Sequence, residues 1–199
     1  EQVGTGADEL KTFASRLKPP SIALAECLVR RYVSSADRVR LRSGRPVALV
    51  VKVADADMVE PVTGALRRIS SPKARIVSTS SKPFTQDLSA VVGAAGGLPS
   101  VHITHELEPV PREYLTLART IEIPFPDGTT VARAIRFVSG GSAPAFVRHL
   151  QLTSLSWDVL CALMPRGAKP GRIGRALREV TGETCGEKAD HPSLEACIE

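Results

Sequence analysis

Arginines are the residues of this 199-residue chain best placed to bind a charged partner. Arg172, Arg175 and Arg178 recur every three positions in a segment with helical periodicity, which predicts one exposed stripe on a helix. Arg119 directly precedes a segment with a period of two, so a rigid strand would fix its position. Guanidinium groups bind the oxygens of phosphates and carboxylates. We predict these four arginines as interface residues, the alternative being a solvated surface, with Arg119 paired to Glu122 or free in solvent.

Two carboxylates follow the most apolar segment of the chain, residues 47–53, which we expect to be a strand buried on both faces. In a phosphate-loop protein, this strand would run into glycines whose N–H groups wrap phosphate and a lysine that neutralises it. The segment instead continues Ala-Asp-Ala-Asp-Met, without glycine and with two charges that repel phosphate. We interpret Asp55 or Asp57 as the N-cap of the next helix. A magnesium site at the pair is the alternative.

The histidines do not complete a catalytic set. His102 and His105 flank a short expected strand, and their odd spacing puts them on opposite faces, which argues against a shared metal. No Ser/His/Asp, Cys/His or paired-carboxylate pattern is legible elsewhere. We therefore predict no catalytic, cofactor-binding or metal-binding residue and no enzyme activity for this chain.

The four cysteines fall into two pairs with different surroundings. Cys27 and Cys161 occupy apolar helical contexts and are expected to be buried free thiols. Cys185 and Cys197 flank a polar tail without the Cys-x-x-Cys or His-x₃-His spacing of a zinc site. A zinc site or a disulfide at this second pair stays a minor alternative, since we expect a reducing compartment.

The bulk properties describe a globular protein of ordinary composition. Apolar residues make up 43% and charged residues 24% of the chain, enough for one core or one core plus a small satellite. The net charge of +5 is compatible with a nucleic-acid or acidic-protein partner. The longest apolar run is far shorter than the ~20 residues that cross a bilayer, so we expect no membrane span and a cytoplasmic location.

Strand-like and helix-like periodicities alternate along most of the chain. This alternation predicts an α/β fold with a mostly parallel sheet flanked by helices. The segment Ser139 to Pro144 is the clearest linker, and the chain beyond it is helical in character. We divide the chain into amino-terminal helices, an α/β core, a helical subdomain and a polar tail, at residues 1–43, 44–139, 145–182 and 183–199.

One motif connects this layout to a known family. Residues 119–127 read Arg-Thr-Ile-Glu-Ile-Pro-Phe-Pro-Asp, which resembles the last strand of the AAA+ ATPase core and the start of the helix that follows it. The segment 154–180 resembles the family's lid, with a helix, a loop of small residues and a second helix. The resemblance covers residues 45–182 and implies a degenerate AAA+-like core with a lid-like subdomain. It puts the strand at 101–104 in the place of the family's sensor strand and Arg119 in the place of its second arginine finger.

The departures from the family concern the ATPase chemistry. The glycine loop is absent, and no apolar run ends in Asp-Glu to hold Mg²⁺. His105 stands where the sensor has a polar amide, and Thr116 stands at the other arginine-finger position. The chain therefore resembles the non-hydrolysing amino-terminal module that precedes the active ATPase domain in some bacterial AAA+ proteins. This resemblance implies a role in ring assembly or partner recruitment, with AAA+ ring subunits or another protein as partner and no cofactor.

A second hypothesis comes from the carboxyl-terminal arginines. Residues 154–181 have the layout of a helix-turn-helix, with Arg172, Arg175 and Arg178 on its second helix. A nucleic-acid-binding module is therefore the alternative function. The same three arginines could equally form a solvated face of the lid without a binding role.

Overall fold

The computed structural model describes residues 17–79 and 97–182. The helices expected within residues 1–18 and 88–95 lie wholly or mostly outside the described residues. The polar tail from residue 183 onward, with Cys185 and Cys197, lies outside them as well.

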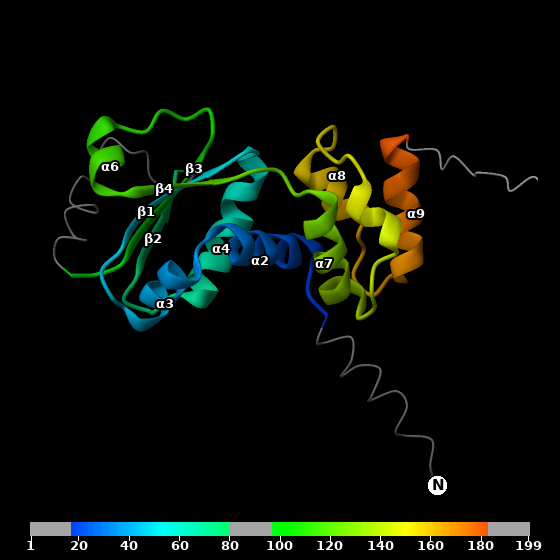
Figure 1. Cartoon of the computed structure of the whole chain (residues 1–199), viewed down its shortest axis with the longest axis horizontal. Helices are drawn as coiled ribbons and strands as arrows, with labels where there is room; N and C mark the ends of the chain where they lie inside the picture. Colours follow the sequence, from blue (N-terminus) through cyan, green and yellow to red (C-terminus); the bar gives the residue numbers. More distant parts are fainter. Residues whose placement is uncertain (1–16, 80–96, 183–199) are drawn as a thin grey trace, which may run out of the picture.

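A parallel sheet forms one half of the molecule (Figure 1). Its four described strands are β1 (Ala48–Val53), β2 (Arg75–Ser78), β3 (Ser100–His105) and β4 (Arg119–Ile123), in the order β2-β3-β1-β4. Every neighbouring pair is parallel. The predicted α/β fold with a mostly parallel sheet is thus confirmed.

The two faces of this sheet differ in chemistry. One face carries apolar side chains from three strands, and they are buried in the main core under α2 (Pro20–Tyr32) and α4 (Val59–Ile69). On the other face, Val50 and Ala118 form a small separate cluster near α6 (Arg112–Leu117). Lys52 and Glu122 lie on this second face at paired register positions. The prediction that the first strand is buried on both faces is therefore only partly right, because Lys52 is half-buried.

Helix α2 lies between the sheet and the helices at the carboxyl-terminal end of the described chain, α7 (Gly128–Ser139), α8 (Trp157–Ala162) and α9 (Pro170–Thr181) (Figure 1). It packs against α4 on one side and against α7 on the other. Pro20 occupies the first turn of α2, where its missing N–H is not needed. A second helix, α3 (Ser35–Ser43), is capped by the Ser34 side chain and ends at Gly44, whose φ of 70° is in the left-handed region.

The helical half, Gly128 to Gly182, packs directly onto the rest of the protein. After α7 it contains the 3₁₀ helix η3 (Ala145–His149), α8 (Trp157–Ala162) and α9 (Pro170–Thr181). Trp157 and Leu177 belong to the same buried cluster as the apolar face of the sheet. The expected linker at 139–144 is closely packed, because a Cβ on Gly141 would lie 2.9 Å from the Pro170 ring. One continuous core therefore joins the two halves.

None of the helices in the described ranges is long and apolar enough to cross a membrane.

Candidate functional site

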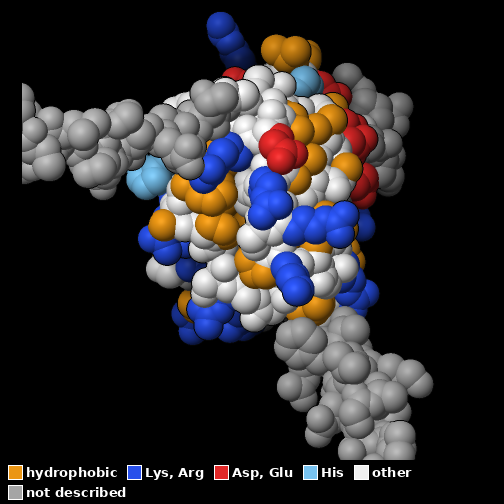
Figure 2. Space-filling model, turned by 90° about the vertical axis from the view of Figure 1, so that its right-hand side faces the viewer, with side chains coloured by type: hydrophobic (Ala, Val, Ile, Leu, Met, Phe, Trp, Pro, Cys, Tyr) orange, Lys and Arg blue, Asp and Glu red, His pale blue; other side chains and the backbone are white. Residues whose placement is uncertain are grey.

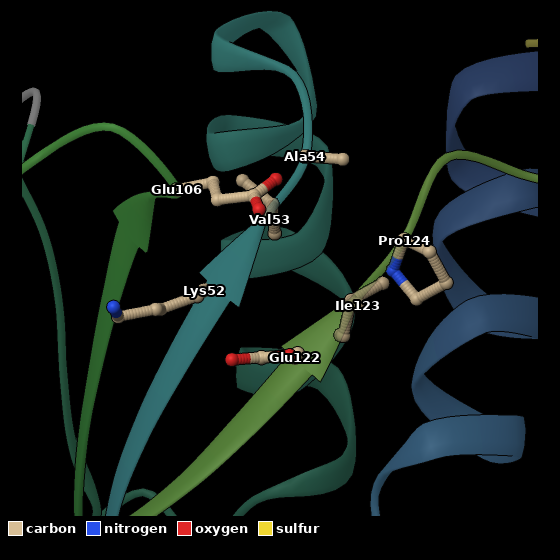
Figure 3. A pocket seen from close by; sticks show the side chains of 7 residues that line it. All are labelled: Lys52, Val53, Ala54, Glu106, Glu122, Ile123 and Pro124. Atoms are coloured by element: carbon tan, nitrogen blue, oxygen red, sulfur yellow. The ribbon is translucent and has the colours of Figure 1, made fainter.

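The carboxyl ends of β1, β3 and β4 surround a hollow of about 290 Å³, which we call the carboxyl-edge hollow (Figure 3). Its lining residues are Lys52, Val53, Ala54, Glu106, Glu122, Ile123 and Pro124. Open α/β sheets bind ligands outside the carboxyl ends of their strands. A nucleotide or substrate site of the kind that α/β proteins usually have would therefore lie at this hollow.

Backbone hydrogen bonds close the strand ends in this hollow. The Ala54 N–H donates to the Ile123 carbonyl at 3.1 Å, and the Glu106 N–H donates to the Val53 carbonyl at 2.8 Å. A phosphate loop needs backbone N–H groups that point at a ligand. The first N–H after β1 is instead used in bonding to β4, so it does not serve an anion.

The charges of the carboxyl-edge hollow also disfavour phosphate. Lys52 and Glu122 project in the same direction from neighbouring strands, and the Glu106 carboxylate lies beside Val53 (Figure 3). Two carboxylates against one ammonium give this hollow a net negative charge. An approaching phosphate would be repelled rather than held.

Asp55, just beyond the hollow, connects the two halves of the molecule. One carboxylate oxygen accepts the Asp57 N–H at 2.9 Å and caps the short 3₁₀ helix η1 (Ala56–Met58) that leads into α4. The other oxygen accepts the Trp157 N–H at 3.3 Å, at the start of α8. The predicted N-cap role of this pair is thus confirmed for Asp55. Within the described residues, no three His, Cys, Asp or Glu side chains lie close enough together to hold a metal.

Arg119, the predicted interface residue on β4, has an intramolecular partner. Its guanidinium group forms an ion pair with Asp37, whose side chain is 3% exposed, and it lies 3.5 Å from the Ser34 hydroxyl. Ser34 also donates to Asp37 at 2.7 Å. The contact ties the start of β4 to the start of α3, and it replaces the pairing with Glu122 or solvent that was the sequence-based alternative. An inter-subunit role for Arg119 stays a prediction.

The three arginines of α9 do not form one equivalent stripe. Arg172 and Arg175 are exposed, and Arg172 borders a small, mostly apolar hollow next to Leu163. Arg178 is half-buried, and its guanidinium carbon lies 3.7 Å from the centre of the Phe146 ring. The reason is geometric, since six residues along a helix rotate the side chain by roughly 240°. Arg178 therefore packs against η3, while the other two remain available to a partner.

A second basic site was not predicted from the sequence. Arg133 and Arg136 on α7 line a hollow of about 390 Å³ together with Arg148 on η3, and we call this the arginine hollow. Thr129 and Ser142 contribute hydroxyl groups to its lining. The spacing of Arg133 and Arg136 marks one helix face, but the approach of Arg148 depends on how η3 folds back. The sequence alone therefore indicates that Arg133 and Arg136 share a face, but not that Arg148 joins them.

The two cysteines in the described part of the chain are not activated thiols. Both described cysteines are free, Cys27 is buried as predicted, and Cys161 is only half-buried. Burial raises the pKa of Cys27 and raises the pKa of Cys161 to about 11. A thiol with a raised pKa is a poor nucleophile near neutral pH.

Two other groups have shifted pKa values with structural causes. Burial lowers the pKa of His102 to about 4, and the nearby Glu108 offsets this only in part. Burial alone would raise the pKa of Asp127, but hydrogen bonds from Thr130 and Arg31 outweigh it and lower the pKa. Asp127 accepts the Thr130 N–H at 2.8 Å and caps α7, as predicted. Both shifts are explained by packing and capping.

Comparisons with protein-family models, curated proteins and solved structures find no match to this chain.

Proposed function

We propose that this chain is a non-catalytic AAA+-like module that acts in ring assembly or in the recruitment of a protein partner. A parallel sheet followed in the chain by a helical half supports the proposal, because this is the order of an AAA+ core and its lid. The segment that resembles the family's last strand, Arg119 to Asp127, contains β4 and the cap of α7. On this proposal, the part of the helical half from residue 145 to residue 182 corresponds to the lid.

The contact of Asp55 with Trp157 is the observation that carries the non-catalytic part of the proposal. In a nucleotide-binding module, the turn after the first strand would hold phosphate between the core and the lid. Here that turn presents a carboxylate, and the carboxylate bonds to the backbone of α8 in the helical half. A direct bond therefore takes the place of a bridging nucleotide, and the two halves need no ligand to stay together.

The nucleotide part is tested with ATP, Mg²⁺ and tripolyphosphate. We expect no phosphate release above the buffer rate, and no preference for ATP over tripolyphosphate in calorimetric titrations. ATP hydrolysis, or ATP binding at least about tenfold tighter than tripolyphosphate, about 1.4 kcal/mol, would overturn the non-catalytic proposal. Asp55→Ala serves as a control, because removing the carboxylate alone does not create a phosphate loop and should not restore binding.

The partner part is tested on the native protein isolated from its own cells with its partners bound. It should sediment as an assembly that contains AAA+ ATPase subunits. The double variant Arg172→Ala/Arg175→Ala should shift the distribution toward slower species, because these side chains are exposed on α9. The matched control is Arg42→Ala/Arg45→Ala, which removes the same charge from an exposed surface around the end of α3. A monomer in all three samples, or equal losses in both variants, would contradict the assignment.

Nucleic-acid binding remains the second candidate, and the surface charge of the helical half favours it. Lys and Arg side chains are spread over the face seen in Figure 2, whereas acidic ones gather mainly toward its upper right. Binding of this kind weakens steeply as salt increases, since each neutralised phosphate releases counterions. A short duplex that binds with such a salt dependence, and that loses affinity in Arg172→Ala/Arg175→Ala, would favour this candidate over the protein partner.

A further inference from the structure

The arginine hollow is built on two elements whose separation is fixed. Arg133 and Arg136 lie one turn apart on the exposed side of α7, whose opposite side is buried in the core. Arg148 lies on η3, which packs closely against the first turn of α7. A Cβ on Gly128 would lie only 2.3 Å from the Val147 carbonyl oxygen, so the two backbones are in direct contact. The three guanidinium groups therefore project from a rigid frame.

Within residues 17–79 and 97–182, no acidic side chain lines this hollow to balance its charge. No carboxylate is among its lining residues, which are Thr129, Ala132, Arg133, Arg136, Ser142, Ala143 and Arg148. Lys18, Arg31, Arg68 and Arg119, which form ion pairs elsewhere in the described part of the chain, do not line this hollow. Three like charges around one hollow repel each other, and an anion bound among them would relieve that repulsion.

The polar side chains of the lining select the kind of anion. Arginine is a donor without an acceptor, and its planar fork matches the oxygens of phosphate. The hydroxyl groups of Thr129 and Ser142 can donate as well. A volume of about 390 Å³ falls in the range of small-molecule sites, roughly 300–1,000 Å³. A compact ligand with many acceptor oxygens and several negative charges suits such a lining best.

We propose that the arginine hollow binds the polyphosphate group of a small molecule, through Arg133, Arg136 and Arg148. A hollow of about 390 Å³ suits a short chain of phosphates, whereas a nucleic-acid backbone would need a basic track along the surface. The site lies on α7 and η3, away from the turn after β1, where an ATPase would hold its nucleotide. It therefore extends the proposed function, and it does not require ATP hydrolysis.

The experiment is a calorimetric titration of the chain with tripolyphosphate, pyrophosphate and orthophosphate at about 0.15 M salt, where exposed charges are already screened beyond ~8 Å. Affinity should increase with the number of phosphates, and tripolyphosphate should bind at least about tenfold more tightly than orthophosphate. Arg136→Ala and Arg148→Ala should each weaken tripolyphosphate binding about tenfold or more. Arg136→Lys should recover part of the loss, because it keeps the charge and removes the fork.

The control is Arg42→Ala/Arg45→Ala, which removes two exposed charges around the end of α3 and should leave the affinity unchanged. Because the mutated arginines are exposed, melting temperatures within a few degrees of the parent should show that the variants are folded. Absent binding, equal affinity for all three phosphates, or an equal loss in the control would overturn the proposal. Tighter binding of a single-stranded oligonucleotide than of tripolyphosphate would also overturn it, in favour of a nucleic-acid surface. ATP hydrolysis would contradict the non-catalytic proposal and leave this one standing.

Discussion

The carboxyl-edge hollow and the arginine hollow show opposite uses of polar groups. At the sheet edge, backbone donors bond to neighbouring strands, and charges of both signs stand side by side. Between α7 and η3, three guanidinium groups gather without a carboxylate in the lining. The position where α/β proteins usually bind ligands is thus engaged in internal bonding. Of these two hollows, the one suited to an anion lies in the helical half.

This difference separates what holds the molecule together from what it offers to a partner. The carboxylates of Asp55 and Asp37 are both engaged in contacts within the protein. Asp55 caps η1, and Asp37 forms an ion pair with Arg119. The ion pairs named above for the described residues do not include the arginines of the arginine hollow. Mutations at the first kind of site should reduce stability, and mutations at the second kind should change binding only.

The largest effect is expected at Ile123, which ends β4 and is 1% exposed. Ile123→Asp would bury an unpaired charge in the core, at a cost of several kcal/mol out of a total stability of about 5–15 kcal/mol. Urea unfolding followed by circular dichroism measures the loss. The control is Glu122→Gln, whose side chain is exposed and should change the free energy of unfolding by less than about 0.5 kcal/mol. Similar urea midpoints for the two variants would mean that Ile123 is not buried in the core.

Gly128→Ala should have the next largest effect, because the added Cβ would meet the Val147 carbonyl at 2.3 Å. The backbone of η3 would have to move, which should cost about 3 kcal/mol and loosen the arginine hollow. Gly64→Ala is the matched control with the opposite sign. Its Cβ meets only the end of the Arg68 side chain at 3.6 Å inside α4, so it should stabilise the helix by about 0.5–1 kcal/mol. Thermal melts of both variants test the pair, and two shifts in the same direction would refute the predicted contact.

His102 should make stability depend on pH, with an effect on the order of 2 kcal/mol. Its pKa is about 4 in the folded protein and about 6.5 when unfolded, so the unfolded chain binds the extra proton first. The stability contributed by neutral His102 is therefore present above about pH 6.5 and lost as the pH falls toward 4. Urea unfolding at about pH 7 and about pH 5 should show this loss. His102→Gln should flatten the curve in that interval, and an unchanged slope would assign the dependence to other groups.

The fold could be predicted because the signals that define it are local. Alternation in β4 and the cap at Asp127 are each contained within a few neighbouring residues. The close packing of Gly141 within the segment 139–144 could not be predicted, since glycine favours both flexible chain and close backbone approach. Only the position of Pro170 in space distinguishes the two.

The contacts of the candidate sites could not be predicted, because they join residues far apart in the sequence. Arg119 and Asp37 are separated by 82 positions, and Asp55 and Trp157 by 102. The local pattern around Arg119 or Trp157 does not indicate which distant carboxylate will contact that residue. Arg178 shows the same limit, since its contact with Phe146 depends on where η3 lies. These long-range contacts are therefore seen only in the folded structure.

The smallest predicted effect concerns the bond that joins the two halves. Asp55→Ala removes the cap of η1 and the acceptor of the Trp157 N–H, which should cost about 1 kcal/mol in the free energy of unfolding. Hydrogen exchange of the Trp157 amide should speed up in this variant. Asp55→Asn keeps an oxygen acceptor and should retain most of the stability and the protection.

Asp57→Ala is the control for charge, because this neighbouring carboxylate is exposed and its described role is to donate a backbone N–H that the substitution preserves. A stability loss in both alanine variants would point to a general effect of negative charge at the start of α4. A loss confined to Asp55→Ala, together with faster exchange at Trp157, would show that this carboxylate links the sheet to the helical half. Unchanged exchange at Trp157 would show that the Asp55 carboxylate does not hold the start of α8 in place.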